Sequence, residues 1–133
     1  MDAKTYVLDT SALLAWMQSG PGSDAVSGYL ASQCFLSAVN LAELVSKLID
    51  LNHAGPEKIP GQLRAMGLQI VSFDDTQALI SGALRAVTRA RGLSLGDRAC
   101  LALAQQLNAE VVTADNAWTG LDLSLTITNI RHH

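Results

Sequence analysis

Cysteine, histidine and charged residues are scarce in this sequence, and their scarcity excludes several classes of protein. Of the 133 residues, 49% are hydrophobic and only 16% are charged, which is too apolar for a disordered chain. No apolar run approaches the ~20 residues that a membrane-spanning helix requires. The composition therefore predicts a compact domain with its own hydrophobic core, and the length suits one domain.

The sequence has few cysteines and histidines that could act as catalytic groups or metal ligands. Cys34 and Cys100 lie in apolar segments without the spacing of a metal site, so we expect buried free thiols. His53 is the only histidine away from the end of the chain, and no Ser-His-Asp or Cys-His set accompanies it. A Walker-type loop and a GxGxxG fingerprint are absent as well. These absences argue against triad hydrolases, P-loop enzymes and dinucleotide-binding folds.

The first residues, MDAKTYVLD, enter an apolar run at once and lack the basic flank and cleavage site of a signal peptide, so we expect a cytoplasmic protein. The net charge of -3 does not favour nucleic-acid binding, although it can hide a local basic face or acids that a cation neutralises. His132 and His133 are either native or the remainder of a purification tag. The expected single domain therefore covers residues 1–131.

Short apolar segments alternate with segments of helical period along the chain. We expect strands at 4–8, 34–36, 68–73, 110–113 and 125–130. We expect helices at about 12–17, 23–31, 41–51, 56–66, 76–91 and 95–107. Several strands are continuous apolar runs, which is typical of a parallel sheet with helices on both faces. The sequence thus predicts a three-layer α/β/α domain with a short, mainly parallel central sheet.

Helix 76–91 and helix 41–51 carry further local signals. Asp74 is a suitable N-cap for the first, whose apolar stripe includes Leu79 and Val87. Asn40 followed by Glu43 resembles a capping box for the second.

Four acidic residues fall where such a sheet would bring them to one edge. Asp9 and Asp115 follow strands, while Glu43 and Asp97 lie in the first turns of helices that enter from the same side. Clustered carboxylates are costly to bury unless they are hydrogen-bonded or bind metal. Hard oxygen ligands suit Mg2+ or Mn2+ better than Zn2+, and such an ion serves phosphoryl chemistry by activating water.

Each acid also has a purely structural explanation. Asp97 and Glu43 could complete capping boxes, and Asp9 and Asp115 could accept hydrogen bonds from the backbone amides that follow them. Four independent caps need not converge, however. Asp74 also follows a strand, but capping explains it, so Asp74 and its neighbour Asp75 are left out of the expected site.

Four segments resemble PIN-domain ribonucleases, and specifically the toxin of a VapBC-type toxin–antitoxin pair. These segments are VLDTSALLA at 7–15, SAVNLAELVSKL at 37–48, LSLGDRACLALA at 93–104 and VVTAD at 111–115. They occur in the order of the family, and the resemblance spans nearly the whole chain.

The resemblance implies endonucleolytic cleavage of RNA by metal-activated water. It implies that Mg2+ or Mn2+ is held at Asp9, Glu43, Asp97 and Asp115. Glu43 would bind the ion through water or orient the nucleophile, and the other three acids would be the main ligands. Supporting polar positions fall on Ser11, Asn40 and Thr113.

The resemblance also implies a homodimer and a cognate antitoxin, which would insert a basic side chain into the acidic pocket. The first two expected helices could line an apolar groove of this chain that receives the antitoxin, with Trp16, Met17 and Tyr29 as candidate lining residues. The alternative is that these three side chains simply pack in the core. The basic residues that could contact RNA are Arg85, Arg89, Arg91, Arg98 and Lys47. Of these, Arg98 neighbours Asp97 and could reach into the site. Arg85 and Arg89 would share one helix face, and a merely solvated face is the alternative for that pair.

Two other functions stay open. One is a non-catalytic binding module whose acids dock a basic partner. The other is an aspartate phospho-acceptor domain of the receiver or haloacid-dehalogenase type. Against the second, Asp9-Thr10-Ser11 lacks a second aspartate, and no lysine follows a late strand.

Overall fold

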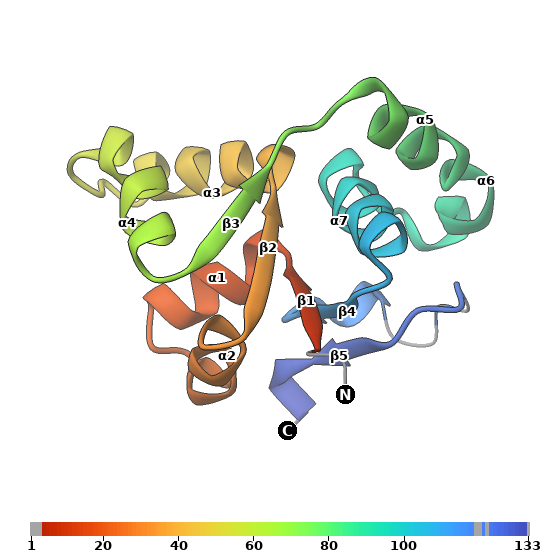
Figure 1. Cartoon of the computed structure of the whole chain (residues 1–133). Coiled ribbons are helices and arrows are strands. Elements are labelled where there is room, and N and C mark those ends of the chain that lie inside the picture. Colours follow the sequence, from red (N-terminus) through yellow and green to blue (C-terminus); the bar gives the residue numbers. More distant parts are fainter. Residues whose placement is uncertain (1–3, 119–120, 122, 133) are drawn as a thin grey trace.

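A five-stranded parallel sheet forms the centre of the computed structural model, which describes residues 4–118, 121 and 123–132 (Figure 1). The strands are β1 (Thr5–Leu8), β2 (Gln33–Ser37), β3 (Leu68–Val71), β4 (Glu110–Thr113) and β5 (Ile127–Asn129). Their order is β3-β2-β1-β4-β5, and every neighbouring pair is parallel. His133 and residues 1–3, 119–120 and 122 of the expected domain lie outside the described part.

Helices cover both faces of the sheet (Figure 1). One layer contains α1 (Thr10–Met17), α2 (Ser23–Leu30), α3 (Ala38–Asp50), the 3-10 turn η1 (Pro56–Lys58) and α4 (Ile59–Ala65). The other contains α5 (Asp75–Ala83), α6 (Arg85–Thr88), η2 (Arg89–Arg91) and α7 (Leu95–Leu107). Two further 3-10 turns are η3 (Asn116–Trp118) and η4 (Ile130–His132). The expected three-layer α/β/α architecture is confirmed.

Several strands contain continuous apolar runs, because helices bury both faces of the sheet. Successive side chains of a strand point to opposite faces. Val7 packs in the cluster under α7, while Leu8 packs in the cluster under α1 and α3, and both are fully buried. Val111 and Val112 of β4 divide in the same way.

The helix α7 begins and ends at the residues that the sequence predicts. Ser94 and Asp97 form a capping box at its start, and Asn108 ends it in the left-handed conformation. Every residue from Ala99 to Ala104 is buried, because α7 lies between the sheet and α5. The small side chains along this stretch let both neighbours approach closely.

The expected single helix over 76–91 and its apolar stripe are wrong. The segment breaks into α5, α6 and η2, and the side chains of Leu79 and Val87 are 76% and 60% exposed. The face turned toward α7 instead carries buried Gln77 and Ser81. Ser81 and Arg98 exchange hydrogen bonds between the two helices. Leu84 packs in the apolar cluster of α7, so the buried face combines polar and apolar groups.

The start of α3 also differs from the prediction. Its N-cap is Ser37, whose side chain accepts a hydrogen bond from the Val39 amide at 3.2 Å. Asn40 therefore lies inside the first turn and does not cap the helix. Cys34 and Cys100 are buried and free, as expected. In the described ranges, every helix is too short or too polar to cross a membrane.

Candidate active site at the carboxyl ends of the strands

Asp9 is the most deeply enclosed acid of the candidate site, with 3% of its surface exposed. It follows β1 directly and caps α1, accepting a hydrogen bond from the Ala12 amide at 2.9 Å. The Thr113 hydroxyl donates to Asp9 Oδ2 at 2.6 Å, and Ser11 Oγ lies 2.8 and 2.9 Å from the two carboxylate oxygens. Thr113 reaches Asp9 because β1 and β4 are paired in parallel at their carboxyl ends.

Glu43 lies where α3 meets α7. Asn40 Nδ2 donates to Glu43 Oε1 at 3.0 Å and lies 3.1 Å from the Gly96 carbonyl oxygen, so Asn40 bridges the two helices. Thr10 Oγ1 is 3.2 Å from Glu43 Oε1 and 3.0 Å from the Asn40 carbonyl oxygen. Thr10 was not among the residues predicted for the site, although its position directly after Asp9 at a strand-to-helix switch could have indicated it.

Asp97, in the first turn of α7, and Asp115, just after β4, complete the set. Asp97 Oδ2 accepts a hydrogen bond from the Ser94 amide at 2.9 Å within the capping box. Asp115 follows β4, and its Oδ1 accepts from the Ala117 amide at 2.8 Å. Both side chains are only partly exposed. The local structural roles proposed for Asp9, Asp97 and Asp115 are therefore present.

The four acidic side chains also converge on one place. All four carboxylates line one cavity of about 190 Å³, together with Thr10, Ser11, Asn40, Lys47 and Ser94. The elements that bring them together are two strand ends and two helix starts at the same edge of the sheet. Capping alone does not require this common cavity, so the structure supports a site in addition to the caps.

The cavity concentrates negative charge. Burial raises the pKa of Asp9 from 3.8 to about 6, against the lowering effect of hydrogen bonds from Thr113, Ala12 and Ser11, while the Asp97 charge adds to the rise. Burial also raises the pKa of Asp97, and the nearby charges of Asp115 and Glu43 raise it further. Among the described residues that line the cavity, Lys47 is the only lysine or arginine.

The donor set fits a hard divalent cation. Carboxylate, hydroxyl and amide oxygens line the cavity, and these are the ligands that Mg2+ and Mn2+ prefer. Asn40 Oδ1 is buried and has no hydrogen-bond partner among the described residues. Within the same residues, no three acidic, histidine or cysteine side chains are yet gathered as a ligand cluster. Binding of an ion by several of these side chains would therefore require them to move toward one another.

Three basic residues predicted to meet RNA lie away from this cavity. Arg98 Nη1 donates to the Ser81 carbonyl oxygen at 3.0 Å, which turns the guanidinium toward α5. The expectation that Arg98 reaches into the site is therefore wrong. Arg85 and Arg89 are exposed, but they lie in α6 and η2 and do not share one continuous helix face. Contact of these residues with RNA stays a prediction.

Gly96 is the point where α7 approaches the Glu43 carboxylate. A Cβ atom at this position would overlap Glu43 Oε1, Cδ and Oε2. A glycine is therefore needed here so that the Glu43 carboxylate can lie against the α7 backbone. The reason is space and not backbone conformation, because Gly96 is helical.

Replacing Asp9 by asparagine is expected to stabilise the metal-free protein at neutral pH. The raised pKa means that the folded state holds the Asp9 proton more tightly than the unfolded chain. The protonated Asp9 therefore stabilises the folded state fully below about pH 4. This stabilisation is lost as the pH rises to about 6, where Asp9 ionises in the folded protein. The rise corresponds to at most about 3 kcal/mol, less the cost of altered hydrogen bonds. Urea unfolding of both proteins in EDTA, from pH 4 to pH 8, measures the difference. A constant difference across this range would contradict the assignment.

Gly96→Ala is expected to keep the fold but displace Glu43. Alanine favours the helix by about 1 kcal/mol, and the group it meets is the end of a flexible side chain. The melting temperature in EDTA should therefore stay close to that of the unchanged protein, while the stabilisation by Mn2+ falls. Gly82→Ala is the matched control, because a Cβ there meets no atom within 4 Å. Equal Mn2+ stabilisation in both variants would show that the approach of Gly96 does not position Glu43.

Comparison with known proteins agrees with this architecture. The sequence matches the PIN domain family over residues 6–122, which is most of the chain. No curated protein matches it.

Several solved structures have the same fold. A toxin–antitoxin complex from Klebsiella pneumoniae is 18% identical, with a TM-score of 0.73 over 95% of this chain and 98% of that chain. DNA-bound VapBC from Salmonella typhimurium is 17% identical, with a TM-score of 0.73 over 96% and 98%. VapBC-1 from nontypeable Haemophilus influenzae is 18% identical, with a TM-score of 0.67 over 95% and 98%. At these identities the likeness concerns the fold, and the family follows from the match along the sequence: the chain belongs to the PIN-domain family.

Proposed function

We propose that this chain is a metal-dependent endoribonuclease and the toxin of a type II toxin–antitoxin pair. The observation that carries the proposal is the convergence of four carboxylates on one cavity in a PIN-domain protein. A non-catalytic docking module would not require four acids, two of them with a raised pKa, around one cavity. A metal-dependent cleavage site for a phosphodiester uses such a set, because the carboxylates hold the cation.

Asp9, Asp97 and Asp115 would hold Mg2+ or Mn2+, and Glu43 would bind it through water or orient the attacking water. When bound, the ion would activate water and stabilise the charge on the departing oxygen. The hydroxyls of Ser11 and Thr113 restrict the Asp9 carboxylate to one orientation. In the same way, Asn40 and Thr10 hold Glu43 through Oε1. These neutral donors orient the acids without adding a competing positive charge.

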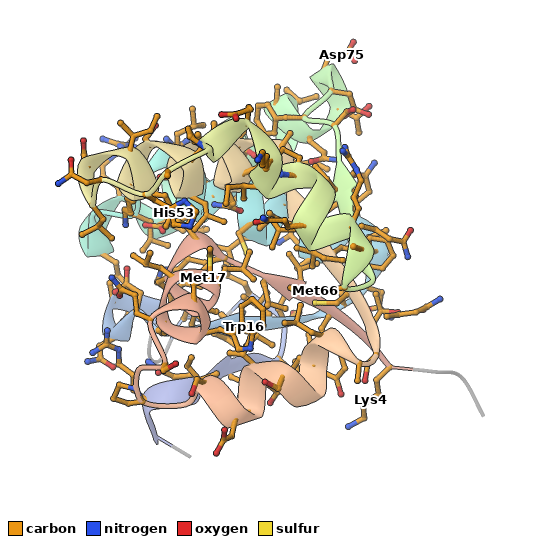
Figure 2. All side chains as sticks on the ribbon, turned by 90° about the vertical axis from the view of Figure 1, so that its left-hand side faces the viewer. Lys4, Trp16, Met17, His53, Met66 and Asp75 are labelled. Carbon is orange, nitrogen blue, oxygen red and sulfur yellow. The ribbon has the colours of Figure 1, made fainter. Side chains whose placement is uncertain are left out.

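An antitoxin partner belongs to the same proposal, because the structural relatives described above were solved as toxin–antitoxin or VapBC complexes. A groove of about 470 Å³ between α1 and α4 suits an apolar segment of such a partner. Its lining residues are Trp16, Met17, Ile59, Gln62, Leu63 and Met66. Figure 2 looks onto this face, where the side chains of Trp16, Met17 and Met66 lie near one another.

The groove differs from the one that the sequence suggests. Tyr29 does not line it, since its ring packs on Tyr6 with 4.6 Å between the ring centroids. The second wall comes from α4 and not from α2. Trp16 Nε1 donates to Ser27 Oγ at 3.0 Å, which connects α1 to α2. The homodimer and the cytoplasmic location stay predictions of this function.

Purified, antitoxin-free protein is expected to cleave RNA in Mn2+ or Mg2+ and to lose this activity in EDTA. Asp97→Asn should reduce the rate by at least about 100-fold, because it removes a ligand charge. Asp75→Asn is the matched control, since Asp75 is exposed and does not line the cavity. End-mapping of a mixed pool of transfer, ribosomal and messenger RNA measures the cleavage. Intact RNA under all conditions, with tight binding of a basic protein partner, would favour the docking-module alternative.

Met66→Glu is expected to weaken inhibition by the antitoxin by at least about tenfold, because a charge would be buried in an apolar contact. RNA cleavage itself should not change, since Met66 does not line the acidic cavity. The antitoxin is the small protein whose co-expression suppresses growth arrest by this chain. Leu107→Glu is the control, because Leu107 is 36% exposed, close to the 37% of Met66, and lies outside the groove. Equal inhibition of both variants would place the antitoxin elsewhere.

A further inference from the structure

Lys47 is a basic side chain at the wall of the acidic cavity. It lies on α3 one turn after Glu43 and is exposed. Its neighbours in the cavity wall are otherwise acidic or neutral. The arginines considered for RNA contact do not line this cavity. A cation at this position is suited to an anion that enters the cavity from solvent.

A second recess, of about 270 Å³, adjoins the acidic cavity and shares Lys47 with it. Its lining residues are Leu14, Gln18, Lys47, Asp50 and Leu51, and most of the lining surface is apolar. Leu51 is 54% exposed, so its apolar side chain is available to a ligand in this recess. The apolar side chains of this recess are partly exposed to solvent, so they are not fully buried in the hydrophobic core.

Two helices lead from one recess to the other. The helix α1 begins beside Asp9 in the acidic cavity and ends at Gln18, its C-cap, in the second recess. The helix α3 carries Glu43 at the first and Asp50 at the second. Because α1 and α3 pack against each other, the two recesses form one continuous surface with Lys47 between them.

We propose that the second recess is a base-binding subsite for the nucleotide next to the scissile phosphodiester, and that Lys47 contacts an RNA phosphate between the two recesses. This inference rests on the proposed ribonuclease function. It assigns substrate contacts to residues that the carboxylate site does not include.

The chemistry of the recess matches a nucleobase. Leu14, Leu51 and the aliphatic stem of Lys47 offer an apolar floor on which a flat base can lie. Asp50 accepts hydrogen bonds only, while the Gln18 amide both donates and accepts. A carboxylate at the rim favours a base with an exocyclic amino group, and adenine, cytosine and guanine carry one. Uracil has no amino group, so it should be disfavoured at this position.

Lys47 is the charge complement of a phosphate at this place, because the other charged side chains that line the two recesses are carboxylates. A phosphate between the recesses would be attracted by Lys47, while the ion of the proposed function would offset the charge of the four acids. The groove between α1 and α4 lies on other residues and shares none with the second recess.

The test compares Lys47→Met and Asp50→Asn with the unchanged protein on a pool of single-stranded RNA with random sequence. Lys47→Met keeps the length of the side chain and removes its charge. KM should therefore rise about three- to tenfold with little change in kcat. The slope of log KM against log salt concentration should fall by about one, because one phosphate contact is lost. Asp50→Asn should allow uracil at one position beside the cut and leave the other positions unchanged. Arg85→Met is the control, because Arg85 is exposed and lies in neither recess.

The outcomes separate this inference from the function on which it rests. If the unchanged protein cleaves RNA but both variants keep its KM, salt dependence and base preference, the subsite is wrong and the nuclease stands. If both variants instead lose inhibition by the antitoxin with unaltered cleavage, the recess is a protein-docking site, which also overturns the inference. Absence of cleavage by the unchanged protein with either ion would refute the ribonuclease proposal and the subsite together.

Discussion

Placement of four carboxylates around one partly buried cavity is the constraint on which the rest of this structure depends. The sheet places Asp9 and Asp115 at neighbouring strand ends, and two helix starts add Glu43 and Asp97. Burial raises the pKa of Asp9 and Asp97, which shows that the fold tolerates this charge at a cost. Each acid is restrained by neutral donors from its own neighbourhood, so the acids line one cavity without collapsing together.

The contact between α3 and α7 connects the site to the core. Asn40 spans the two helices, and Gly96 permits the Glu43 carboxylate to lie directly against α7. On its other side α7 is paired with α5 through Ser81 and Arg98. Site geometry and packing are thus coupled, because the same first turn of α7 carries Asp97, approaches Glu43 and is held by α5.

Much of the fold could be predicted from the chain, and the errors have physical causes. The limits of α7 and β4 follow from clear caps and apolar runs. The stripe through Leu79 and Val87 failed, because periodicity does not reveal that a polar pair, Ser81 and Arg98, would occupy the interface. Arg98 was assigned to the site from its proximity to Asp97 in sequence, but adjacent residues of a helix point in different directions.

The sequence by itself determined the helix–strand alternation, the four acids at element ends and the motifs of the family, since these depend on local periodicity and capping chemistry. Only the tertiary structure decided that the acids share one cavity, because their separation along the chain reaches from residue 9 to residue 115. It also decided that Lys47 joins that cavity to a second recess and that the groove beside Trp16 is closed by α4. These are contacts between distant segments, and no local pattern encodes which side chains meet there.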